Sequence, residues 1–355
     1  MPAAERAAAV PPPRYTVRDT PAVVARIDAD LRRVADTVRR GDPRLCALVL
    51  TGAFARGEGA VSGGRPQNDY DFVALRGLGR PSVPYERMRE TLEEELRIHV
   101  DLQPVWGLRL RWAAPSIFWY ETALRGRVVW GDGDALKPIR VRDARELHPA
   151  EGLRLLVNRA AGLLLSKGSS DTELLRIQAA KGMLAALDAQ LLALGEFAPS
   201  QTERWAIYRS RWSAGCHRAV RGDPAAYAWA YRYKVDPDRA PPRHPREAWD
   251  LAARTILAAI PAALAHARLS SLDAYARRDG LLDHLYYYKG AREVPGARRL
   301  LLHPTGRVRV ATLRLLEEAV GGTAGASARQ DLARFAPVPQ DPVSLLAALR
   351  RATLQ

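Results

Sequence analysis

The first half of the chain alternates short apolar runs with amphipathic stretches. Apolar residues before Gly41 recur at the spacing of one helix face. Continuous apolar runs, such as residues 45–50, are typical of buried strands. The expected elements, in order, are a helix ending at Gly41, strands over residues 45–50 and 69–75, an acidic surface helix over 84–98 and a strand over 99–106. This order predicts a small α/β unit with a mixed sheet.

The pattern changes to helical periodicity after Pro149. Residues 116–134 still predict a helix followed by a short strand or turn, RVVWG. Beyond Pro149, five segments repeat apolar residues at helical spacing, without the alternation of strands. We therefore expect an α+β N-terminal domain with a mixed sheet over residues 18–145, followed by an all-α domain over residues 146–355.

Length and composition agree with two ordinary folded domains. The chain has 355 residues, 47% hydrophobic and 26% charged. Its two cysteines, Cys46 and Cys216, imply no disulfide framework, so a reducing, cytoplasmic compartment is predicted. No run of about 18 uncharged apolar residues occurs, so no membrane span or membrane partner is expected. Residues 1–17 are interpreted as a flexible arm rather than a signal peptide.

The net charge of +15 favours polyanionic partners such as nucleotides or nucleic acid. Residues 1–145 carry 24 Lys and Arg against 19 Asp and Glu, a surplus of +5. Residues 146–355 carry 30 against 20, a surplus of +10. Because the arginines are dispersed, a bias toward Arg and Ala in the coding sequence is an equally good explanation.

Two aspartates stand two positions apart in the second expected strand. Asp69 and Asp71 therefore point to the same face of the sheet, where two unpaired carboxylates repel each other. A divalent cation removes that conflict, and Mg²⁺ suits it because Mg²⁺ takes oxygen ligands and is commonly shared with phosphates. If the strand over 99–106 is a neighbour, Asp101 completes a cluster of three carboxylates, enough for two metal ions.

The first strand ends in a turn that suits phosphate. A strand-to-helix turn at Gly52 and Ala53 would direct backbone N–H groups at a polyphosphate, and Gly52 permits a close approach. Arg56 is expected either near these phosphates or in an ion pair with Glu58. Each part alone has an ordinary explanation, because Asp-x-Asp is often a turn and glycine-rich segments are often loops. The argument depends on their order along the chain.

This order, LTGAFARGEG…NDYDFVAL…HVDLQPV, resembles the nucleotidyltransferase superfamily typified by DNA polymerase β. The Ala-Arg-Gly-Glu segment is similar to minimal and aminoglycoside-type members, and to uridylyltransferases that act on signalling proteins. The resemblance covers roughly residues 45–106 and extends loosely into the helical half. It implies transfer of a nucleoside monophosphate from an NTP co-substrate, with release of pyrophosphate and a requirement for Mg²⁺, as one or two ions.

The resemblance also assigns roles to individual residues. Asp69 and Asp71 become metal ligands, and Asp101 becomes the third ligand and a candidate base for the attacking hydroxyl. Gly52 and Ala53 become the phosphate-binding turn. The family often has Ser where Ala53 stands, which removes one hydroxyl contact to phosphate.

Two further departures from the family are visible in the sequence. Residues 61–67 look like an inserted flexible loop, and Tyr70 stands where an aliphatic residue is usual. All three carboxylates are nevertheless present, so neither departure argues against activity.

The helical half offers weaker signals. Lys181 lies on an amphipathic helix and is a candidate to reach the NTP phosphates, with an exposed surface lysine as the ordinary alternative. Asn158 and Arg159 interrupt an apolar helix and are candidates for the same cleft. Residues 203–234 interleave aromatics with arginines, a mixture that can stack bases and hold phosphates, although aromatics at helical spacing are more typical of a core.

The sequence therefore predicts a Mg²⁺-dependent nucleotidyltransferase acting on an acceptor hydroxyl of a small molecule, an RNA or a protein. The basic helical half favours RNA such as tRNA, or another polyanion, over a cationic aminoglycoside. Two alternatives stay open: a toxin–antitoxin or regulatory component that acts on a partner protein, and a catalytically idle nucleic-acid-binding module.

Overall fold

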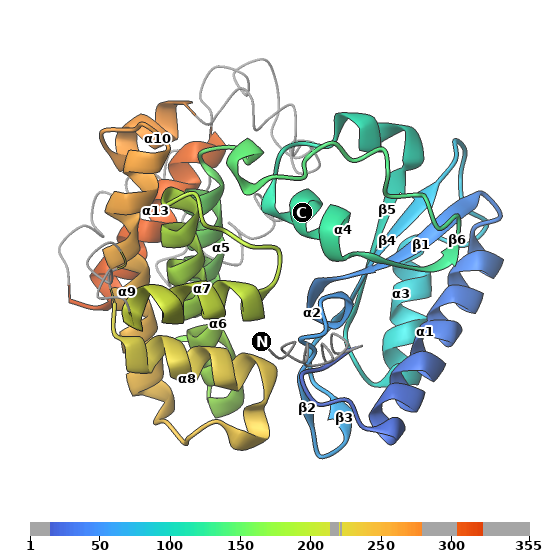
Figure 1. The fold of residues 1–355 in the computed structure, drawn as a ribbon, viewed down its shortest axis with the longest axis horizontal. Coiled ribbons are helices and arrows are strands. Elements are labelled where there is room, and N and C mark those ends of the chain that lie inside the picture. The colour runs from blue at the N-terminus through green and yellow to red at the C-terminus, as the bar shows by residue number, and fades with distance from the viewer. Residues whose placement is uncertain (1–14, 214–219, 221, 279–303, 322–355) are drawn as a thin grey trace, which may run out of the picture.

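The computed structural model describes residues 15–213, 220, 222–278 and 304–321. An α/β part and a helical part lie beside each other, on the right and left of Figure 1. The α/β part is built on a four-stranded sheet in the order β5-β4-β1-β6. Its strands are β1 (Leu45–Thr51), β4 (Tyr70–Arg76), β5 (Val100–Trp106) and β6 (Arg127–Gly131).

The sheet is mixed, as predicted. β1 is antiparallel to β4 and to β6, whereas β4 and β5 are parallel. The helix α3 (Tyr85–Leu96) provides the crossover that a parallel pair requires. β1, β4 and β5 each begin within one residue of the predicted strands. β1 and β4 are buried along most of their length, as expected for central strands covered on both faces, whereas β5 is an edge strand with exposed residues.

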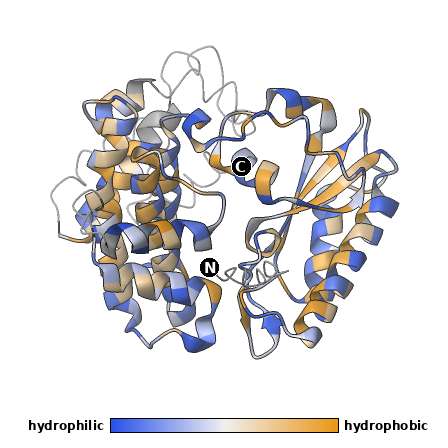
Figure 2. Ribbon diagram, viewed as in Figure 1, coloured by the Kyte–Doolittle hydropathy of each residue, from blue (hydrophilic) through white to orange (hydrophobic). Residues whose placement is uncertain are grey.

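Each face of the sheet has its own hydrophobic cluster. Leu48, Leu50 and Phe72 pack with α1 (Pro21–Gly41) and α3 on one face. Val49 and Val73 pack on the opposite face with α4 (Ile117–Arg125) and with side chains from the helical part. Strands β1 and β4 are hydrophobic along most of their length (Figure 2). Because side chains alternate along a strand, Asp71 lies on the same face as Val73, which is the face toward the helical part.

The segment 61–67, which the sequence led us to expect as a flexible loop, forms a small hairpin. Its strands are β2 (Val61–Ser62) and β3 (Arg65–Pro66). Gly63 and Gly64 both have positive φ, which is what a tight two-residue turn between right-twisted strands requires. The hairpin touches the helical part, where the Ser62 hydroxyl donates to Asp238 at 2.5 Å.

The second part is helical throughout its described residues. Its helices are α5 (Glu151–Ser166), α6 (Thr172–Ala193), α7 (Gln201–Ser213), α8 (Pro224–Val235), α9 (Pro245–His266), α10 (Leu272–Arg278) and α13 (Pro304–Ala319). Helix α9 is long and apolar enough to cross a membrane by composition, but half of its most apolar window is buried, and it packs against α6 and α5. This packing is typical of a core helix in a soluble protein.

The predicted arm over residues 1–17 needs one correction. Residues 1–14 lie outside the described residues, but Tyr15 and Thr16 are buried in the α/β part. The Tyr15 hydroxyl donates to Asp28 at 2.6 Å, and the backbone amide of Thr16 donates to Asp19 at 3.0 Å. The apolar ring of Tyr15 was overlooked because it follows a proline run and an arginine, Arg14.

Candidate active site

The three aspartates singled out in the sequence lie together at one end of the sheet. Asp71 of β4 stands directly beside Asp101 of β5 in the parallel register. On its other side, Asp71 is paired with Thr51 of β1. Asp69 directly precedes β4 and shares the face of Asp71. The condition placed on Asp101, that its strand neighbours β4, is therefore met.

The pKa of Asp71 reflects the closeness of the three carboxylates. Burial, together with the negative charges of Asp69 and Asp101, raises the pKa of the Asp71 carboxyl to about 6. The positive charges of Lys234 and Arg56 act in the opposite direction. Asp71 and Asp69 are half-buried, whereas Asp101 is exposed and accessible from solvent. The carboxylate of Asp71 is thus partly withdrawn from water beside two like charges.

Gly52 stands against the carboxylate of Asp71. A strand-to-helix turn is present as predicted, since β1 runs directly into the single turn α2 (Gly52–Ala55). Gly52 has φ +67°, a conformation that L side chains rarely adopt, and a Cβ on it would lie 1.9 Å from Asp71 Oδ2. No side chain is tolerated here for both reasons. Ala53 is buried, and its place in the turn agrees with the sequence reading.

Cations from three helices of the helical part act on the carboxylates. Arg159 is on α5, Lys181 on α6 and Lys234 on α8, and all three are half-buried. Burial lowers the pKa of each side chain, and the charges of nearby carboxylates, Asp71 in every case, act to raise it. None of the three has a hydrogen-bond or ion-pair partner for its side chain among the described residues.

Lys234 is the residue that sequence reasoning missed. Burial, together with the positive charges of Lys181, Arg56 and Arg159, lowers its pKa to about 7. Nothing in the sequence marked it, because it ends the segment AYAWAYRYK, in which the aromatics dominate the pattern. Asn158, a candidate for the same cleft, is exposed on α5, and nothing in the structure connects it to the carboxylates.

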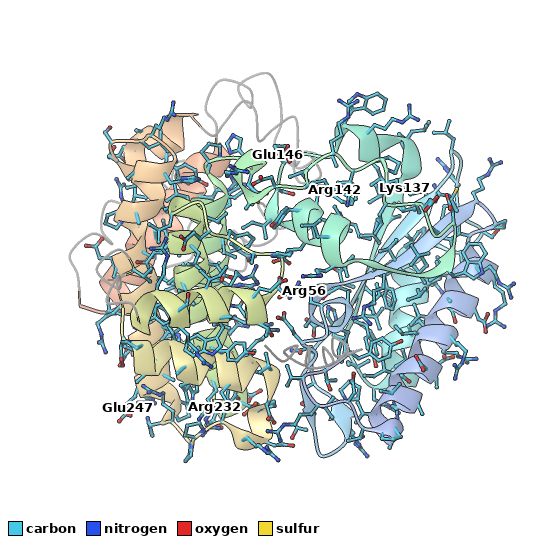
Figure 3. All side chains as sticks on the ribbon, viewed as in Figure 1. Arg56, Lys137, Arg142, Glu146, Arg232 and Glu247 are labelled. Atoms are coloured by element: carbon cyan, nitrogen blue, oxygen red, sulfur yellow. The ribbon has the colours of Figure 1, made fainter. Side chains whose placement is uncertain are left out.

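Arg56 forms the ion pair with Glu58 that was one of its two expected positions. Its Nε lies 3.0 Å from Glu58 Oε2, and one of its terminal nitrogens lies 2.7 Å from Glu121 Oε2. These two carboxylates hold the pKa of Arg56 above its usual value. Arg56 therefore acts on Asp71 and Lys234 through its charge, while its hydrogen bonds go to glutamates. In Figure 3 it lies between the two parts of the molecule.

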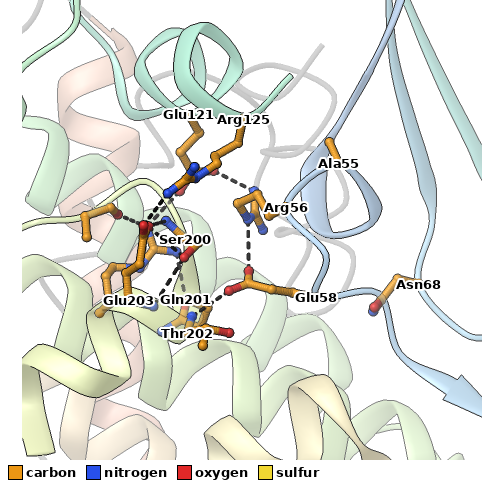
Figure 4. A network of polar contacts seen from close by, with 12 residues as sticks. Ala55, Arg56, Glu58, Asn68, Glu121, Arg125, Ser200, Gln201, Thr202 and Glu203 are labelled. Carbon is orange, nitrogen blue, oxygen red and sulfur yellow. Dashed lines mark hydrogen bonds and ion pairs between the residues drawn. The ribbon is translucent and has the colours of Figure 1, made fainter. Parts of the chain in front are cut away.

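The same glutamates connect the two parts (Figure 4). Glu121 of α4 also accepts from Arg204 of α7 at 2.8 Å, and Glu58 accepts from the backbone amide of Thr202 at 2.5 Å. Arg204 is buried and lies 3.0 Å from Asp188 of α6. A chain of buried or half-buried charges thus fixes α6 and α7 against the turn after β1.

The donor set suits a hard divalent cation. Asp69, Asp71 and Asp101 offer oxygen ligands of the kind Mg²⁺ prefers, and their mutual repulsion is the condition that a cation relieves. Among the described residues, no three Asp, Glu, His or Cys side chains are gathered closely enough to hold a metal alone. Oxygens from water and from a bound phosphate would therefore complete the coordination, which is usual for Mg²⁺.

Comparison of the chain with protein-family models, curated proteins and solved structures found no match in any of the three.

Proposed function

We propose that the protein is a Mg²⁺-dependent nucleotidyltransferase that moves a nucleoside monophosphate from an NTP to an acceptor hydroxyl. One observation carries the proposal: three carboxylates on adjacent parallel strands face three half-buried cations without partners. Carboxylates and unpaired cations at one site suit a ligand that is itself anionic and metal-bound. A nucleoside triphosphate has both properties.

The cations are suited to the phosphates. Lys181, Lys234 and Arg159 come from three different helices, so together they can contact several phosphate oxygens of one triphosphate. Their low exposure strengthens these contacts, because charge interactions are weakly screened where water is excluded. When bound, Mg²⁺ supplies charge neutralisation to the phosphates beside Asp69 and Asp71.

The transfer step can be written from the residues present. The oxygen of the acceptor hydroxyl bonds to the α-phosphorus, and the bond from that phosphorus to pyrophosphate breaks. Asp101 accepts the hydroxyl proton, a role that its exposure permits. Lys181 and Lys234 stabilise the charge that develops on pyrophosphate.

Pyrophosphate release tests the proposal directly. The protein is incubated with each NTP, Mg²⁺ and one acceptor class at a time: tRNA, small alcohols or candidate proteins. Asp71→Asn is expected to abolish release, whereas Asp250→Asn, an exposed aspartate on α9, is expected to leave it unchanged. The proposal fails if no NTP is turned over and if Asp71→Asn alters neither NTP nor Mg²⁺ binding. That result would favour an idle binding module.

The acceptor is proposed to be polyanionic, and RNA is the first choice. Residues 146–355 carry the larger share of the surplus positive charge, +10 of +15. Binding to RNA that weakens as salt rises would support this, because phosphate contacts release counterions. The label of an α-labelled NTP identifies the acceptor that receives it.

A further inference from the structure

A pocket separate from the carboxylates lies between the segment before α1 and the helices α7 and α8. We call it the α7–α8 pocket. Its volume is about 340 Å³, at the lower end of small-molecule sites. It is lined by Val17, Arg18, Trp205, Arg209, Ala228, Tyr231, Arg232, Val235 and Asp236. The lining thus combines arginines with two large aromatic rings.

The aromatic side chains form an ordered platform. The rings of Trp205 and Tyr231 are stacked, with centroids 5.3 Å apart and planes 17° from parallel. The Tyr231 hydroxyl donates to Thr202 at 3.2 Å, which fixes its ring. Both side chains are half-buried, so part of each ring borders the pocket. Because these two rings face each other and Trp205 also packs against Tyr208, with centroids 5.6 Å apart, a flat aromatic ligand can extend the stack on the Tyr231 side.

The charge of the lining is positive. Arg18 pairs with Asp236 at 2.8 Å, and Arg209 and Arg232 add two further positive charges to the lining. Arg232 is exposed on α8 (Figure 3) and makes no ion pair among the described residues. Arginine presents a planar fork that matches phosphate oxygens. An acidic peptide would use the arginines and leave the rings without a flat partner.

The pocket is connected to the carboxylate site through α8. Lys234, which acts on Asp71, follows Tyr231 by three residues on the same helix. Thr202, which holds the Tyr231 hydroxyl, also donates its backbone amide to Glu58 beside the turn of Gly52. A ligand in the pocket would therefore lie next to the proposed NTP site on its helical side.

From this arrangement we propose that the α7–α8 pocket binds one nucleotide unit of the acceptor, with its base against Tyr231 and its phosphate on Arg232. The assignment to the acceptor rests on the proposed nucleotidyl transfer, whereas the binding itself does not. The unit can come from a single-stranded RNA or from a free mononucleotide, which share this chemistry.

Fluorescence anisotropy with a labelled single-stranded oligoribonucleotide tests the proposal across a range of salt concentrations. Arg232→Ala should weaken binding and reduce the slope of log affinity against log salt by about one, because one phosphate contact is lost. Tyr231→Leu should weaken binding on the order of tenfold through the lost stacking surface, whereas Tyr231→Phe retains the ring and the affinity. Arg87→Ala, an exposed arginine on α3, is the matched control.

Competition by AMP and UMP distinguishes the two sources. If the mononucleotides compete with the oligomer and Arg232→Ala weakens the binding of both equally, the pocket takes a free nucleotide. If Arg232→Ala weakens the binding of the oligomer alone, the pocket takes an RNA strand. Affinities of oligomer and mononucleotides that are unchanged in Arg232→Ala and Tyr231→Leu would overturn the proposal, as would absence of binding by the unmodified protein. Pyrophosphate release by the unmodified protein is measured separately, with Asp71→Asn as its control, so failure of the transfer reaction is distinguishable from failure of the pocket.

Discussion

Replacing Asp71 by Asn should stabilise the metal-free protein while abolishing its activity. The carboxylate of Asp71 is half-buried beside two like charges, and its pKa is about 6. An unperturbed Asp has a pKa of about 3.9, so the difference is about 2 units, and each unit corresponds to about 1.4 kcal/mol. Partial exposure reduces the full value, so ionised Asp71 costs about 1–3 kcal/mol of folding free energy at pH 8.

The pH dependence of this effect has a defined sign. A carboxyl whose pKa is raised in the folded state binds its proton more tightly there than in the unfolded chain. The cost of ionised Asp71 is therefore fully present above pH 6 and disappears as the pH falls through 6 toward 4. The free energy of unfolding of Asp71→Asn should exceed that of the unmodified protein at pH 8, and the difference should shrink to about a third of that value at pH 4.5.

Urea denaturation in the presence of EDTA at pH 8 and pH 4.5 measures the difference. Asp250→Asn, which removes an exposed carboxylate from α9, controls for the general loss of one negative charge. Mg²⁺ should then stabilise the unmodified protein more than Asp71→Asn, by about 2.7 kcal/mol at 100 times the dissociation constant. If Asp71→Asn is destabilising at pH 8 without metal, the reasoning about crowded carboxylates is wrong.

Three further substitutions test separate parts of the site. Gly52→Ala places a Cβ against the Asp71 carboxylate at a residue with positive φ. We expect the variant to lose pyrophosphate release and about 1–2 kcal/mol of its free energy of unfolding in urea. Normal turnover would contradict the close approach of Gly52 to Asp71. Lys234→Met should raise the KM for NTP by tenfold or more in the same assay, whereas an unchanged KM would remove Lys234 from the phosphate site. Glu121→Gln removes a negative charge that pairs with Arg56 and Arg204, so the urea midpoint should fall by an amount equivalent to about 3 kcal/mol. An unchanged midpoint would show that Arg204 is satisfied without Glu121.

Local patterns predicted most of the α/β part. Short apolar-rich segments marked β1, β4 and β5, and the period-two rule placed Asp69 and Asp71 on one face before any pairing was known. The hairpin over 61–67 was missed because two glycines in succession are equally typical of a loop and of a tight turn. Arg56 illustrates the same limit, since the sequence offered two partners for it and the fold supplied a third, Glu121.

The sequence by itself determined the kinds of chemical group at the candidate site: the carboxylates, the glycine turn and a surplus of positive charge. These are set by residue type and by short-range spacing, which depend on local backbone geometry alone. Only the tertiary structure decided that Asp101 stands in register with Asp71 and that Lys234 acts on Asp71 from a helix about 160 residues farther along the chain. Strand order and the docking of helices depend on burial summed over many distant contacts, and no local pattern encodes which distant residues meet.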